Sequence, residues 1–253
     1  MLTFTEAQLL AWITPLLWPL LRALALLSTM PVLGTRMVMA RVRVGLALLL
    51  AVAAQAVLPP IAPVALDSPV AFALVLQQLL VGVSLGFAVR IVFAAVEFAG
   101  EVVGLQMGLN FAGFFDPSTS GQGTVTGRMF GTLVAWVFIV TNGHLVVLAS
   151  LVRSFEVFPV SPQPFQDVMK LAPHTWGSEI FLLGLWIALP LIVMLLFVNL
   201  VLGVISRVAS QMNVFSVGFP VTLGVGLIGM LTTLPLLEQP FMMALERMLS
   251  RFQ

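Results

Sequence analysis

The chain has 253 residues, of which 60% are hydrophobic and 8% are charged, and its mean hydropathy is +1.12. This composition is typical of an integral membrane protein and lies well away from that of a soluble domain. A net charge of +1 with a single lysine leaves no basic surface for nucleic acid, and the lack of cysteine excludes disulfides and thiol chemistry.

Six apolar runs follow one another along the chain, each about as long as a helix that spans a bilayer. They cover residues 7–33, 44–66, 70–96, 129–152, 178–205 and 214–237. Each run is expected to be helical, because a backbone in lipid must satisfy its hydrogen bonds within its own segment. The sequence therefore predicts an all-α integral membrane protein of about six long helices, in contact with membrane lipid.

Several positions interrupt these runs. Arg22 lies inside the first run and Arg90 inside the third. Pro190 is expected to kink the fifth run, because proline removes a backbone donor from the helix. Thr141-Asn142-Gly143 indicates a helix break just before His144, inside the fourth run. The helices are therefore expected to be partly kinked.

The basic residues give an untidy orientation signal. Arg36, Arg41 and Arg43 place the first loop in the cytoplasm, because cytoplasmic loops carry an excess of Lys and Arg. Six simple crossings from that start put four later basic residues on the outside: Arg153, Lys170, Arg247 and Arg251. Two interpretations stay open: a six-span bundle with a weak orientation signal, or helical hairpins supported mainly by other protein chains.

A glycine-rich polar stretch at residues 100–127 lies between the third and fourth runs. Glycines recur there every four residues, so they share one face of a helix. Small side chains on that face let a second helix backbone approach closely. We expect a packing and assembly site made of Gly100, Gly104, Gln106, Met107 and Gly108.

Arg90, Glu97 and Glu101 are expected to form buried polar pairs, because a charge taken out of water needs a partner. The functional alternative is a secondary transporter of a small solute that uses these three residues as coupling groups. Such transporters are often built from inverted repeats, and no matching pair of halves is visible in this chain. Two carboxylates without a third ligand hold a metal weakly, so no metal site is expected.

Three phenylalanines follow the glycine face: Phe111, Phe114 and Phe115. Asp116-Pro117 ends the helix near them, because the residue before a proline is biased away from helical geometry. The phenylalanines either cover a patch of core or form a movable constriction, since apolar rings can close a pore by excluding water.

A second polar region at residues 206–220 separates the last two apolar runs. We expect a hairpin turn that is also a subunit contact, formed by Arg207, Gln211, Asn213, Gly218 and Pro220. Gly82-Val-Ser-Leu-Gly86 matches the Gly-x-Ser-x-Gly pattern of serine hydrolases, but no strand precedes it and a small-residue packing face explains it better. The chain offers no nucleophile–base constellation, and we expect no enzyme.

The run from Gly100 to Pro117, with Gly104-Leu-Gln-Met-Gly108 and Asp116-Pro117, resembles the FliR family of bacterial flagellar export-gate proteins. Gln211 to Pro220 is similar to that family's second signature, although Ser210 stands where the family often has proline. The resemblance spans nearly the whole chain. Injectisome export proteins of the SpaR/YscT type share the architecture, and the Gly-Leu-Gln-Met-Gly sequence favours the flagellar branch.

The resemblance implies a structural and gating subunit of a hetero-oligomeric type III export gate, in the bacterial inner membrane within the flagellar basal body. It implies FliP and FliQ as partners in one complex, FlhB and FlhA nearby, unfolded export substrates, and no cofactor. Residues 1–175 would be FliP-like, with the pore-loop region 106–122, and residues 176–253 would be a FliQ-like hairpin. The implied pore plug comprises Asn110, Phe111, Phe114, Phe115, Asp116 and Pro117.

Overall fold

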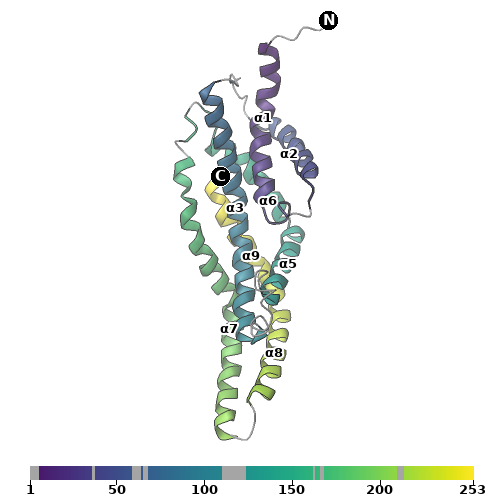
Figure 1. The fold of residues 1–253 in the computed structure, drawn as a ribbon, viewed down its shortest axis with the longest axis vertical. Coiled ribbons are helices and arrows are strands. Elements are labelled where there is room, and N and C mark those ends of the chain that lie inside the picture. Colours follow the sequence, from purple (N-terminus) through teal and green to yellow (C-terminus); the bar gives the residue numbers. More distant parts are fainter. Residues whose placement is uncertain are drawn as a thin grey trace. The chain divides into compact units, whose positions relative to one another are not determined.

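The computed structural model describes residues 6–35, 38–58, 64, 68–109, 124–161, 163–165, 168–209 and 214–253. Within these ranges all regular structure is helical (Figure 1). The α-helices are α1 (Glu6–Thr29), α2 (Ala40–Gln55), α3 (Pro69–Gln106), α5 (Val125–Val140), α6 (Gly143–Val157), α7 (Gly177–Val208), α8 (Val214–Thr233) and α9 (Glu238–Leu249). Short 3₁₀ turns are η3 (Val168–Leu171), η4 (Pro173–Trp176), η5 (Leu234–Leu237) and η6 (Ser250–Phe252).

Three apolar helical stretches of the described chain are long enough to cross a membrane, namely Pro69–Gln106, Pro173–Val208 and Ser216–Phe252. The broken pair α5 and α6 raises this number to four if the pair counts as one span. The all-α membrane class with several long apolar helices is confirmed. The fourth run breaks at Asn142, whose φ is 58°, the helix of the second run ends at Gln55, and the first run forms α1, a helix of 24 residues.

Contacts divide the chain into two compact units, each assembled from separate stretches of sequence. The first unit comprises Met1–Arg90, Asn142–Trp176 and Leu245–Gln253, and the second comprises Ile91–Thr141 and Gly177–Ala244. The division into a FliP-like part at residues 1–175 and a FliQ-like part at residues 176–253 rests on a resemblance to other proteins, and it stays a prediction.

In the first unit, α1 packs along the beginning of α3. Trp18 is fully buried against Ala71 and Leu74. A Cβ at Gly82 would lie 2.7 Å from the Cβ of Ala25, and a Cβ at Gly86 would lie 2.8 Å from the Cβ of Thr29 and 3.0 Å from the carbonyl oxygen of Leu26. The Gly-x-Ser-x-Gly pattern thus lies on a face of α3 that contacts α1, and the two helices run in the same direction.

In the second unit, the end of α3 packs against α5, α7 and α9. Phe93 meets Phe138 and Phe241 edge to face, with ring centroids 5.5 and 5.6 Å apart. Such pairs contribute beyond their buried area, because the ring edge is positive and the ring face negative. Helices α7 and α8 form a hairpin, visible in Figure 1, in which Gly229 contacts Leu191.

Candidate functional site

The glycines that recur along α3 lie directly against α5. A Cβ at Gly100 would lie 2.7 Å from the Cγ of Phe130 and 2.8 Å from the carbonyl oxygen of Thr126. A Cβ at Gly104 would lie 3.0 Å from the Cβ of Thr126. Phe130 and Thr126 are themselves buried, so neither has room to retreat. Any side chain at these two glycines would push the helices apart.

The α5 side of this contact has glycines of its own, which sequence reasoning missed. A Cβ at Gly127 would lie 2.8 Å from the Cγ of Glu101, and a Cβ at Gly131 would lie 2.8 Å from the Oε1 of Glu97. The order of contacts reverses between the helices, so α3 and α5 are antiparallel. The spacing of four between Gly127 and Gly131 is the same signal that marked the α3 face. We call this two-sided contact the glycine interface.

The three predicted charged residues are not buried within this chain. Arg90 and Glu97 are exposed and Glu101 is half-buried. The carboxylate side chains instead extend over the glycines of α5. That these three residues form buried polar pairs in the assembled protein stays a prediction.

The fully buried charge of the described chain is Arg22, which the sequence marked only as an interruption. Its Nε donates to Gln78 Oε1 at 2.7 Å, its Nη1 to Ser154 Oγ at 2.9 Å, and its Nη2 to the Phe158 carbonyl at 2.8 Å. Its Cζ also lies 3.6 Å from the ring centroid of Phe155.

These partners of Arg22 are neutral, and they stabilise a cation in three ways. They accept charge-assisted hydrogen bonds, the Phe155 ring presents its negative face, and Phe158 is the C-cap of α6, where the helix dipole is negative. Gln78 is held in turn by Gln77, whose Oε1 accepts from Gln78 Nε2 at 2.9 Å. Arg22 therefore ties α1, α3 and the end of α6 together.

The C-terminal end of α3 is anchored by Met107. Met107 is fully buried, and a Cβ at Gly226 of α8 would lie 2.6 Å from its Cγ. Gly108 has φ 79°, a left-handed conformation that glycine adopts without strain and that commonly follows the end of a helix. Beside it, the Oε1 of Gln106 is buried and makes no hydrogen bond to any residue that the structure describes.

Several predicted residues lie outside the described part of the chain: Asn110, Phe111, Phe114, Phe115, Asp116, Pro117, Gln211 and Asn213. Of the remaining turn residues, Arg207 is exposed in the last turn of α7. Gly218 and Pro220 lie in the first two turns of α8, after the turn itself.

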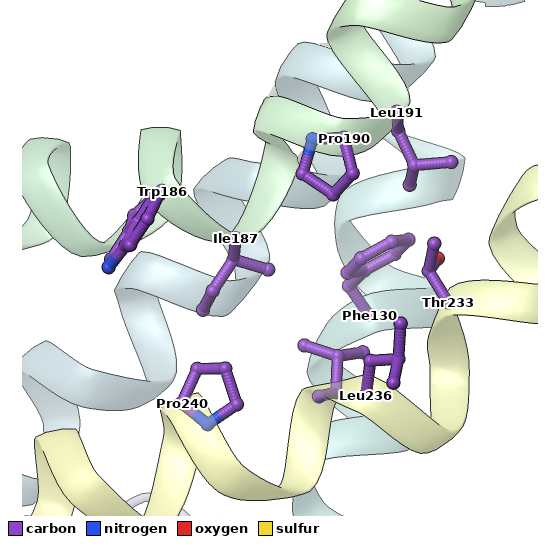
Figure 2. Close-up of a pocket in the computed structure, with 9 residues that line it drawn as sticks. Phe130, Trp186, Ile187, Pro190, Leu191, Thr233, Leu236 and Pro240 are labelled. Atoms are coloured by element: carbon purple, nitrogen blue, oxygen red, sulfur yellow. The ribbon is translucent and has the colours of Figure 1, made fainter.

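A cavity of about 140 Å³ opens between α5, α7 and the end of α8. Figure 2 shows Pro190 and Leu191 of α7 on one side, Leu236 and Pro240 on the other, and the Phe130 ring between them. Pro190 cannot donate to the Trp186 carbonyl, which loosens α7 at this turn. Thr233, the one polar residue of the lining, donates its hydroxyl to the Gly229 carbonyl at 2.9 Å, so this lining offers no catalytic group.

Residues 13–248 match the sequence model of the bacterial export proteins, family 1. The chain belongs to this family. The flagellar biosynthetic protein FliR of Escherichia coli (strain K12) is 44% identical over 95% of this chain and 92% of that protein. FliR of Pectobacterium carotovorum subsp. carotovorum is 41% identical over 95% of this chain and 92% of that protein. FliR of Aquifex aeolicus (strain VF5) is 35% identical over 85% of this chain and 83% of that protein.

The family match covers both units and both polar regions from which the resemblance was inferred, so that resemblance is confirmed. It includes the glycine interface and Arg22. Among the described residues, no group of three or more His, Asp or Glu side chains could hold a metal ion. The contacts found are those of helix packing.

Proposed function

We propose that this chain is a structural subunit of the flagellar protein-export apparatus in the bacterial inner membrane. The observation that carries the proposal is the family match over residues 13–248, together with relatives named flagellar biosynthetic protein that are covered almost end to end. The apolar helices of span length support a membrane location.

The proposed partners are FliP and FliQ in one complex, with FlhB and FlhA nearby. The surface of α7 supports an assembly, because it exposes large aromatic side chains: Phe181 is 59% exposed, Trp186 70% and Phe197 68%. Aromatic residues are enriched where protein surfaces meet. The most apolar window of this helical span is only 22% buried inside the chain, which leaves most of it to be covered by something else.

The proposed gate is the region 106–122, whose phenylalanines would close the pore at rest. The support comes from the two helix ends that border it. Met107 anchors the end of α3 on α8, and Thr124 caps the start of α5 by accepting from the Gly127 backbone N–H at 3.0 Å. Gly104 and Thr126 contact each other across the glycine interface, so the segment leaves and re-enters the same helix pair.

In this role the subunit is passive. Unfolded substrates cross a pore that the complex forms, and the energy for transport comes from elsewhere. The proposed function therefore assigns packing roles to Gly100, Gly104 and Met107, and no catalytic role to any residue.

Secretion of flagellar proteins tests this function. We expect deletion of the gene to abolish the release of filament and hook proteins into the medium, and a plasmid copy of the chain to restore it. Normal secretion by the deletion strain would contradict the proposal. The control is a strain in which the antibiotic-resistance marker alone is inserted at a neutral site of the chromosome.

A further inference from the structure

Two helical segments are interrupted on opposite sides of the same cavity. In α7, Pro190 leaves the Trp186 carbonyl without its helical donor, and both residues line the cavity. On the other side, α8 and α9 are joined directly by the 3₁₀ turn η5, which lies inside the span-length stretch Ser216–Phe252. Prolines and 3₁₀ turns within a long helical stretch are common sites of kinks and hinges.

The last turn of α8 is weakened by its own side chains. The hydroxyls of Thr232 and Thr233 both donate to the Gly229 carbonyl, each at 2.9 Å. Hydroxyls that bond back onto the preceding turn often bend a helix. Pro235 then removes the backbone donor that the Leu231 carbonyl would use in an α-helix. Two independent features therefore weaken this side of the cavity.

The cavity gives these two interruptions room to bend. Figure 2 shows Pro190 and Leu191 of α7 facing Leu236 and Pro240, with the Phe130 ring between them. A close-packed interior resists deformation, because any movement of one side chain overlaps another. A cavity between two weak points lets the helices bend without such overlap.

On one side of the interruptions, both segments are fixed to α3. Before Pro190, a Cβ at Gly184 would lie 2.7 Å from the Ala95 carbonyl oxygen. After η5, Phe241 of α9 is fully buried, and its ring centroid lies 5.6 Å from that of Phe93. We call residues 177–189 of α7 and 238–244 of α9 the base.

On the other side, residues 191–208 of α7 and the helix α8 form what we call the arm. The two helices of the arm contact each other, since a Cβ at Gly229 would lie 2.7 Å from the Cδ2 of Leu191. Residues 196–208 include no buried side chain. The arm also contacts the end of α3 at Met107, where a Cβ at Gly226 would lie 2.6 Å from the methionine Cγ. A methionine side chain is flexible enough for this contact to follow a movement.

We propose that Pro190 and η5 form a paired hinge, about which the arm changes its angle to the base. Because the two interruptions border one cavity, both helices bend at the same place and the arm moves as one body. The contact between Leu191 and Gly229 is kept, while the cavity opens and closes. The proposed function assigns no movement to this part of the chain, so the hinge holds or fails independently of it.

Distances between pairs of spin labels test the hinge. The chain lacks cysteine, so two cysteines can be placed freely in the full chain purified in detergent. Leu182→Cys with Val204→Cys joins the base to the arm, and Val193→Cys with Val208→Cys lies within the arm as the control; all four positions are exposed. We expect double electron–electron resonance to give a distance distribution about twofold broader for the first pair. Equal widths would overturn the proposal.

Pro190→Ala distinguishes a hinge from a rigid kink. Alanine restores the donor to the Trp186 carbonyl and has the highest helix propensity. We expect the distribution between positions 182 and 204 to narrow to the width found within the arm. An unchanged width, with or without a shift in the mean distance, would show a fixed kink and refute the hinge.

Filling the cavity gives a second readout. Ile187 lines the cavity, so Ile187→Phe adds volume where the hinge needs room, and we expect the distribution between positions 182 and 204 to narrow about twofold. Leu189→Phe is the matched control, because Leu189 is exposed on α7 outside the lining and should leave the width unchanged. The same width in both variants would contradict the role of the cavity.

Discussion

Glu97 of α3 lies over Gly131 of α5, with its Oε1 2.8 Å from the point where a Cβ of residue 131 would stand. One turn along, Glu101 lies over Gly127 in the same way. The carboxylate side chains fill the space that the glycines leave, so they act in this chain as packing groups on an interface between two antiparallel helices.

Gly104→Ala is expected to destabilise the protein by about 1–3 kcal/mol, because its Cβ would meet buried Thr126 and force the helices apart. Gly104→Leu is expected to block recovery of the complex altogether. The measurement is the thermal midpoint in detergent and the yield of complex. Gly203→Ala is the control, since its Cβ meets nothing within 4 Å and alanine favours a helix. Equal midpoints for the two alanine variants would refute the packing role.

Glu97→Gln combined with Glu101→Gln is expected to leave secretion of flagellar proteins within about twofold of the parent protein. Glutamine keeps the shape that fills the glycine interface and removes only the charge. The measurement is the amount of filament protein in the medium. A secondary transporter that couples flux to these carboxylates would lose its activity in this variant, so a loss of secretion with a normal amount of complex would contradict the packing account.

Arg22→Met is expected to destabilise the chain by about 3–5 kcal/mol, because it leaves the acceptors of Gln78, Ser154 and Phe158 buried without a donor. Arg22→Lys keeps the charge but cannot bond three divergent acceptors, and an intermediate loss is expected. The midpoint of thermal unfolding measures both. Arg247→Met, on the surface of α9, should change little. An Arg22→Met protein as stable as that control would show that the network contributes nothing.

Phe111→Ala combined with Phe114→Ala is expected to make the assembled gate leak ions at rest, because two rings that exclude water are removed. The measurement is ion conductance of the purified complex in a planar bilayer. Phe72→Ala, which changes an exposed ring of α3, controls for loss of apolar surface. A double variant as tight as this control would argue against the plug.

Part of this structure follows directly from the sequence. The spacing of Gly100 and Gly104 predicts a close helix contact on its own, because every fourth residue of a helix shares a face. The break at Asn142 is likewise visible in Thr141-Asn142-Gly143, where an asparagine adopts the left-handed conformation. Hydropathy averaged over a window passes across such a break, which is why the run at residues 129–152 appears continuous although the structure divides it into α5 and α6.

The remaining contacts join residues far apart in the chain and leave no local signal. The acceptors of Arg22 include Gln78 and Ser154, 56 and 132 residues away. These partners are neutral, so no complementary charge points to them. An arginine inside an apolar run predicts that a partner exists, while only the packing of α1 on α3 and α6 shows which side chains supply it.

The central claim is that this chain is one subunit of a hetero-oligomeric export gate, and co-expression with FliP and FliQ from the same cell tests it most directly. After detergent extraction, native mass spectrometry is expected to show a defined hetero-oligomer that contains this chain together with both partners. A stable monomer or homodimer that binds neither partner would contradict the claim.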